Sequence, residues 1–141
     1  MINNNTIFLS HYIDNSTPTY GNKSKVKIKQ TSSIKSGDTA NGYSFSISSN
    51  HIGTHIDLPS HFYDCEKNIS FYNSNTWIFD NIFLLDIETL KPRLIDVNVD
   101  KINKETELLL IRTGYEQFRH LDKYWELYPS LKYSFIKNIK Q

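Results

Sequence analysis

The sequence predicts an α/β or α+β domain built on a mixed sheet. Stretches with strand character dominate the first two thirds of the chain, whereas a pattern typical of an amphipathic helix occurs only near its end. At 141 residues, a single domain covering residues 1–141 is the natural organisation. A chain of this length can bury a hydrophobic core.

Three segments in the first third of the chain have strand signatures. Residues 6–13 are apolar and β-favouring, and the polar residues that follow them are typical of a turn. In residues 24–30, lysines alternate with apolar residues, as on an edge strand. In residues 43–47, apolar residues alternate with serines, which predicts a strand leading toward a histidine-rich segment.

The second half of the chain contains two longer apolar runs. Residues 81–87 and 107–113 are almost continuously apolar, which is typical of central strands covered on both faces. Residues 95–97 are predicted to form a short strand, and the aromatic-rich residues 115–128 to form either a helix or a packed irregular segment. Ser130 is the predicted N-cap of a final helix with its apolar side chains on one side.

Charge and composition point to no class of macromolecular partner. With 16 basic and 15 acidic residues the formal net charge is +1, so there is no electrostatic reason to expect nucleic acid or an anionic membrane as a partner. No apolar stretch approaches the ~18 residues that suggest a membrane span. The single cysteine, Cys65, fits a reducing compartment, so the cytoplasm is the expected location.

The segment from His51 to His61 contains the most distinctive chemistry. Three of the chain's five histidines fall within it, and Asp57 lies between the second and the third. Three imidazoles and a carboxylate are therefore close together in any fold, and these groups are metal ligands. The alternative interpretation is a turn in which the imidazoles hydrogen-bond backbone carbonyls and the aspartate caps local amides.

Backbone geometry limits how His51, His55 and Asp57 can share one ion. On a helix, the aspartate would point well away from His51. On a straight strand the two histidines would stand about 13 Å apart at ~3.3 Å per residue. That separation is too wide for ligand bonds of about 2.0 to 2.2 Å. The sequence therefore predicts a strand ending near His51, a turn at Gly53, which can adopt positive φ, and an extended segment over residues 55–57.

The run His51-x-Gly53-Thr54-His55-x-Asp57-x-Pro59-x-His61 resembles the motif of the cyclase family of metal-dependent hydrolases, which includes bacterial kynurenine formamidases (arylformamidases). The resemblance implies that His51, His55 and Asp57 are metal ligands, with Asp57 able to bridge two ions. It gives His61 the catalytic acid/base role. It also implies a swivelling β/β/α-type domain.

Two weaker similarities occur in the same order as in the family. Residues 9–20 resemble its opening segment, in which the aromatic side chain corresponding to Tyr20 lines the substrate pocket. Residues 109–115 resemble a strand in the middle of the family's domain. Tyr20 is followed by Gly21, where the family commonly has proline.

The resemblance stops short of the family's full length. Family members continue past the segment corresponding to residues 128–131, and the later part supplies a further histidine and a glutamate to the metal site. Neither His120 nor any glutamate of this chain stands in a matching context. The expectation is a C-terminally shortened domain with an incomplete metal shell. Either a partner chain covers the gap as part of a homo-oligomer, or the fold is curtailed.

Two functions are compatible with these residues. The first is a hydrolase that acts on a small amide, formamide or cyclic substrate through a metal-activated water, with zinc as the expected ion and manganese as its competitor. The second is a catalytically silent relative that serves as a metal-binding, ligand-binding or assembly protein. The sequence supports hydrolysis more than redox chemistry, because it has neither a nucleotide-binding glycine loop nor a cysteine cluster.

Two further positions have specific expectations. Pro59 is predicted to keep the end of the motif non-helical, which places His61 on a loop near the cluster. An imidazole there can take a proton from water and return it to a leaving amine. Arg112 lies at the end of a predicted strand, where it can bind a carboxylate substrate or form the more common structural ion pair.

Overall fold

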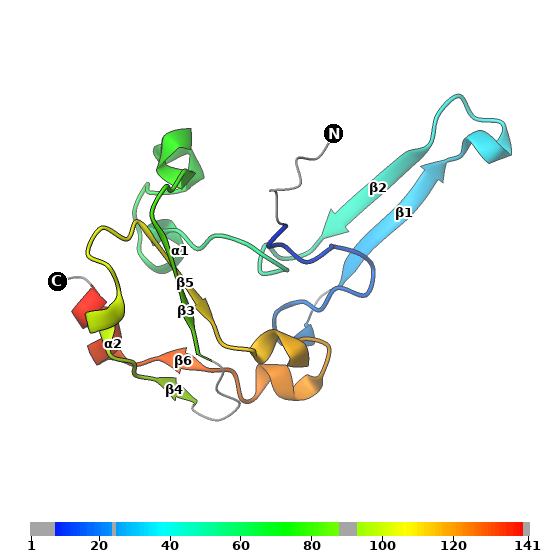
Figure 1. Cartoon of the computed structure of the whole chain (residues 1–141). Helices are drawn as coiled ribbons and strands as arrows, with labels where there is room; N and C mark the ends of the chain where they lie inside the picture. The colour runs from blue at the N-terminus through cyan, green and yellow to red at the C-terminus, as the bar shows by residue number, and fades with distance from the viewer. Residues whose placement is uncertain (1–7, 24, 88–92, 140–141) are drawn as a thin grey trace. The chain divides into compact units, whose positions relative to one another are not determined.

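The computed structural model describes residues 8–23, 25–87 and 93–139. These residues combine short helices with three two-stranded sheets, and the protein belongs to the α/β class, as expected (Figure 1). It forms two compact units, Met1–Asp57 and Leu58–Gln141. The single domain and the β/β/α layering stay predictions.

The first unit is built on an antiparallel hairpin. Strands β1 (Val26–Ser32) and β2 (Gly42–Ile47) pair as the alternating pattern predicts (Figure 1). Ile28 lies opposite Phe45, so apolar side chains share one face while the lysines of β1 occupy the other. Residues 8–13 form no strand, and the predicted strand is wrong there because no described strand pairs with them; residues 6 and 7 lie outside the described part.

The core of the first unit lies at the base of this hairpin. Val26 and Ile52 are only 3% and 6% exposed, and Thr19 is 2% exposed. Thr19 and Ile52 form an isolated antiparallel bridge. Beside it, the Tyr20 N–H donates a hydrogen bond to the His51 carbonyl at 3.3 Å. The bridge therefore fixes the start of the histidine motif against a segment that lies some thirty residues earlier in the chain.

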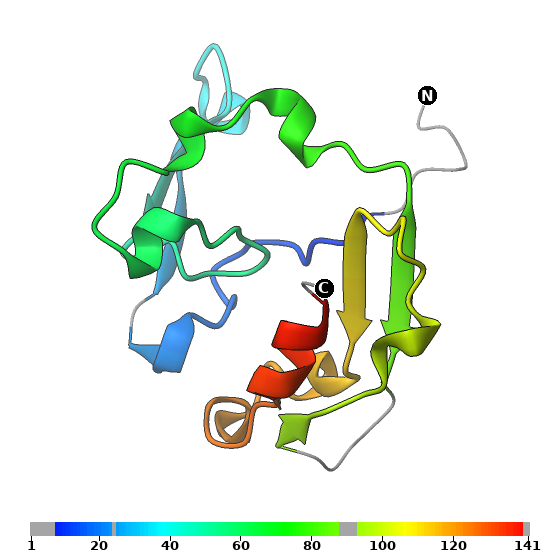
Figure 2. The ribbon, with the colours of Figure 1, turned by 90° about the vertical axis from the view of Figure 1, so that its left-hand side faces the viewer.

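The second unit contains a parallel strand pair. Strands β3 (Ile82–Asp86) and β5 (Leu108–Arg112) run in the same direction and pair along their whole length (Figure 2). Both predicted apolar runs are therefore confirmed as strands. For β3 the expected cover on both faces is wrong, because Ile82 and Leu84 are 53% and 55% exposed on one face while the alternate residues are half-buried. In β5, residues 108–111 are half-buried on both faces.

The end of the chain differs from the prediction at Ser130. Ser130 does not cap a helix but belongs to β6 (Ser130–Leu131), which pairs in parallel with β4 (Leu94–Ile95). The final helix, α2, spans Tyr133–Ile139. Its Phe135 is fully buried, and with Ile95 it supplies the buried apolar core among the described residues of this unit.

Two short helical elements replace a regular helix in the aromatic-rich segment. The 3-10 turns Tyr115–Phe118 and Asp122–Trp125 confirm the irregular alternative. The rings of Tyr115 and Tyr124 stack with centroids 5.2 Å apart, and the Tyr115 hydroxyl donates to the Lys123 carbonyl at 2.9 Å. No helix in the described part of the chain has the length and apolar character needed to cross a membrane.

Glu107 joins the two parallel strands at their start. Its Oε2 accepts hydrogen bonds from the backbone N–H groups of Asp80 at 2.7 Å and Asn81 at 3.2 Å. These bonds favour the charged carboxylate and hold the pKa of Glu107 below its usual range. Between the lowered pKa and pH 4.5, the unfolded chain binds more protons at Glu107 than the folded chain does. The stabilisation of the fold by the charged Glu107 is therefore present above pH 4.5 and is lost as pH falls through the lowered pKa.

We predict that Glu107→Gln lowers the melting temperature at neutral pH and flattens its dependence on pH on the acid side. Neutralising the carboxylate weakens the two charge-assisted bonds and removes the proton linkage. Thermal unfolding followed by circular dichroism between neutral pH and about pH 3 measures both effects. Glu105→Gln, at an exposed position two residues earlier, is the matched control. Equal acid-side slopes for wild type and Glu107→Gln would contradict this account.

Candidate metal centre

The histidine motif leaves the hairpin through an irregular segment. Strand β2 ends at Ile47, and Ile52 forms the bridge to Thr19. Gly53 then has a φ of +55°, in the left-handed region that favours glycine. Residues 55–58 have no regular secondary structure. The predicted turn at Gly53 is confirmed, although the strand ends four residues before His51.

Pro59 has a different effect from the one predicted. Leu58 is extended, with φ −107° and ψ 163°, as expected before proline. Pro59 then opens the four-residue helix α1 (Pro59–Phe62) rather than preventing a helix, because proline at the first helical position loses no hydrogen bond and has a suitable φ. His61 therefore lies on α1, and its backbone N–H donates to the Leu58 carbonyl at 2.8 Å.

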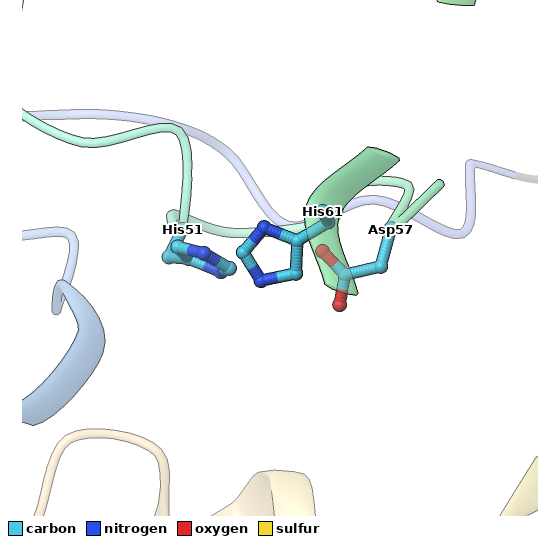
Figure 3. Close-up of side chains that lie close together, drawn as sticks. All are labelled: His51, Asp57 and His61. Carbon is cyan, nitrogen blue, oxygen red and sulfur yellow. The ribbon is translucent and has the colours of Figure 1, made fainter. Parts of the chain in front are cut away.

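Three of the predicted site residues present potential metal-ligand atoms close together. One atom each from His51, Asp57 and His61 lies within 4.8 Å of the other two (Figure 3). His51 is half-buried, whereas Asp57 and His61 are exposed. His51 and Asp57 belong to the first unit, and His61 follows Asp57 by four residues, just past the unit boundary.

The chemistry of this donor set fits a divalent ion. Imidazole nitrogen and carboxylate oxygen are the usual zinc donors besides thiolate, with bonds of about 2.0 to 2.2 Å, so two donors on one tetrahedral ion stand roughly 3.3 to 3.6 Å apart. The observed limit of 4.8 Å is somewhat wider. Asp57 and His61 are exposed, so close packing of their side chains does not hold the donors at this separation.

His55, a predicted ligand, lies outside this group of three but adjoins two of its members. Its ring meets that of His51 edge to face, with centroids 5.2 Å apart, and its Nε2 stands 3.7 Å from Asp57 Oδ1. Its Nδ1 is 3.0 Å from the Gly53 carbonyl oxygen. The carbonyl contact that the alternative interpretation predicted is therefore present at His55, together with proximity to the carboxylate.

Tyr20 also lies beside the cluster. Its ring centroid is 5.8 Å from that of His51, with the planes tilted by 48°, and the side chain is 58% exposed. The Thr19–Ile52 bridge produces this proximity, because it aligns the residue after Thr19 with the residue before Ile52. An exposed aromatic ring next to the candidate ligands is suited to contact a substrate, and this role stays a prediction.

Arg112 forms the ion pair that was expected as its more common role. Its guanidinium donates to both carboxylate oxygens of Asp86, with Nε 2.9 Å from Oδ1. The two residues form the last cross-strand pair of β3 and β5. This bidentate contact occupies the side chain structurally.

The sequence assigned His61 only an acid/base role, whereas the structure also places it among the candidate ligands. The missed signal is proline at the first position of a helical turn. Such a turn brings His61, two residues after the proline, back toward Asp57, two residues before the proline. His51 and Asp57 lie together as predicted.

The fold class and the grouped side chains define an α/β protein with a candidate site for a divalent cation. Residues 7–140 match the family model described as "Putative cyclase". The match covers nearly the whole chain, so this protein belongs to the cyclase family, as its motif indicated. No match was found among curated proteins, and none among solved structures.

We predict that Asp57→Asn weakens Zn²⁺ binding by at least roughly 10 to 100-fold. Substituting a residue that only contacts a metal ligand has an effect of this size, and Asp57 is itself a candidate ligand. Asp57 supplies the only carboxylate in the group of three, and the amide of asparagine removes its charge. Competition titration with a Zn²⁺-binding dye measures the affinity. Asp64→Asn, at an exposed position just outside the motif, is the control. An unchanged affinity in Asp57→Asn would remove this residue from the site.

Proposed function

We propose that this protein is a metal-dependent hydrolase that acts on a small amide, arylformamide or cyclic substrate through a metal-activated water. The observation that supports the proposal most is the grouping of His51, Asp57 and His61 in a chain that belongs to the cyclase family. Zinc is the proposed ion and manganese its competitor. His51, His55 and Asp57 are the proposed ligands.

The residues around the ion have distinct tasks. When bound, a divalent ion lowers the pKa of a coordinated water toward about 7 and polarises a carbonyl oxygen. Asp57 supplies negative charge that attracts and retains the cation. The bridge at Ile52 fixes the backbone of His51 at the start of the motif, and the His51 imidazole is half-buried.

His61 is the proposed acid/base. As a neutral imidazole it accepts a proton from the attacking water, and as an imidazolium it returns that proton to the leaving amine. Its place on the exposed helix α1 leaves the side chain accessible to a substrate. Its closeness to Asp57 also supports a second role as a ligand, and the two roles differ in what happens to the bound metal when the imidazole is removed.

The proposed substrates carry an aryl group, because Tyr20 offers an exposed ring beside His51. Aromatic side chains bind flat apolar groups through offset or edge-to-face contacts. N-formylkynurenine and simple formanilides combine such a group with a formamide bond and are suitable test compounds.

We predict that His61→Ala lowers kcat for formanilide hydrolysis by roughly 10² to 10⁴-fold, which is the usual contribution of a general acid or base. The zinc content per chain stays at the wild-type level if the imidazole transfers protons. His120→Ala, which removes an exposed histidine outside the motif, is the matched control. Persistent turnover in His61→Ala would rule out the acid/base role, whereas loss of zinc would assign His61 to the ligands.

A catalytically silent binding protein is the second candidate. It is favoured by the exposure of Asp57 and His61 and by the small number of ligands gathered in the described residues. Elemental analysis of the purified chain separates the candidates. Close to two ions per chain together with chelator-sensitive turnover support the hydrolase, whereas a chain without metal or activity supports the silent relative.

Two further expectations belong to this proposal. We propose that the protein acts as a homo-oligomer, because the exposed apolar residues of β3 offer a surface that a second chain can cover. We also propose a cytoplasmic location, since the single cysteine is exposed and unbridged in a manner typical of reducing compartments.

A further inference from the structure

The Gly53 carbonyl contacts a specific nitrogen of a predicted ligand. His55 Nδ1 lies 3.0 Å from the Gly53 carbonyl oxygen. A carbonyl oxygen only accepts hydrogen bonds, so this contact requires the proton of the imidazole to be on Nδ1. In the neutral ring, the lone pair then belongs to Nε2. The contact therefore selects one of the two tautomers.

The selected nitrogen is the one that faces the carboxylate. His55 Nε2 stands 3.7 Å from Asp57 Oδ1. Two donors on one tetrahedral zinc ion stand roughly 3.3 to 3.6 Å apart, so the observed separation is close to that of two ligands of the same ion. The Nε2 lone pair and the Asp57 oxygen are both hydrogen-bond acceptors and repel each other at this distance. A cation bound near both atoms is attracted to each of them and offsets this repulsion.

The backbone conformation of Gly53 sets the direction of this segment. Because the peptide that carries the Gly53 carbonyl is planar, the torsion angles of Thr54 and His55 set the distance from this oxygen to His55 Nδ1. The φ of Gly53, +55°, sets the direction in which that peptide, and with it His55, leaves Ile52. A Cβ added at Gly53 would meet only Ile13 side-chain carbons at 3.7 and 3.8 Å, which are ordinary van der Waals distances. The requirement for glycine therefore comes from the backbone angle and not from lack of space.

We propose that Gly53 is a positioning residue whose carbonyl holds the proton of His55 on Nδ1 and thereby presents Nε2, beside Asp57, as the metal-binding atom. The inference rests on the proposed metal-dependent function, and it adds the group that decides which nitrogen of His55 binds. Contacts of this kind, outside the ligands themselves, fix ring orientation and raise metal affinity.

The geometry supplies two substitutions with opposite expectations. Asparagine adopts positive φ far more readily than alanine, so Gly53→Asn keeps the 53–54 peptide and His55 in place relative to His51, whereas Gly53→Ala strains this arrangement. Gly37→Ala is the matched control, because Gly37 also has a positive φ, of +94°, but lies in the hairpin turn away from the motif. It reports the general cost of placing alanine in the left-handed region.

The test is long-range ¹H–¹⁵N correlation spectroscopy of the metal-free full chain at alkaline pH, where imidazoles are neutral. We expect His55 to carry its proton on Nδ1 in the wild type and in all three glycine variants, because the contact is internal to residues 53–55. The resonances are assigned with His55→Gln. In parallel, Zn²⁺ affinity should fall roughly 10 to 100-fold in Gly53→Ala alone.

The proposal is overturned if the wild-type chain carries the His55 proton on Nε2, or if Gly53→Ala binds Zn²⁺ as tightly as the wild type. The wild-type spectrum decides the matter even if Gly53→Ala does not fold. Because the spectrum needs neither metal nor turnover, it is independent of the hydrolase proposal. A chain with the expected tautomer and no activity refutes only the proposed function, and an active chain with the other tautomer refutes only the role of Gly53.

Discussion

The short antiparallel bridge between Thr19 and Ile52 is the contact on which the candidate centre depends. It closes the base of the first unit, where Thr19 and Ile52 are both buried, and it fixes the residue on either side of it. This bridge makes His51 and Tyr20 neighbours, and the turn at Gly53 comes immediately after it in the sequence. An irregular segment thereby starts from a defined position, although it has no secondary structure of its own.

Elements determined by local pattern were predictable from the sequence. The alternation before Ile47 and the apolar run before Arg112 specify strands, because side-chain period and burial are encoded within a few residues. The turn at Gly53 was also predictable, since neither a helix nor a straight strand brings His51 and Asp57 together. The family match over residues 7–140 agrees with the motif that these residues form.

Features that depend on distant partners or on ambiguous local signals were not predictable. Ser130 has the chemistry of a helix cap, but it joins a strand because the Arg93 carbonyl, from a remote part of the chain, accepts hydrogen bonds from its backbone N–H and its hydroxyl. Pro59 is compatible with either the end or the start of a helix, and only the backbone at Leu58 distinguishes the two. The position of His61 relative to Asp57 follows from that choice, so the candidate ligand set was only partly foreseeable.

The lack of regular structure between the bridge at Ile52 and the start of α1 has a consequence for the lifetime of the protein. A cation bound by His51 and Asp57 would tie together the two ends of this irregular stretch, so part of the binding free energy would become folding free energy. Resistance to proteases would then rise with the concentration of free ion, because ligands that bind only the folded chain deplete its opened forms. The supply of the ion would control the abundance of the chain as well as its chemistry.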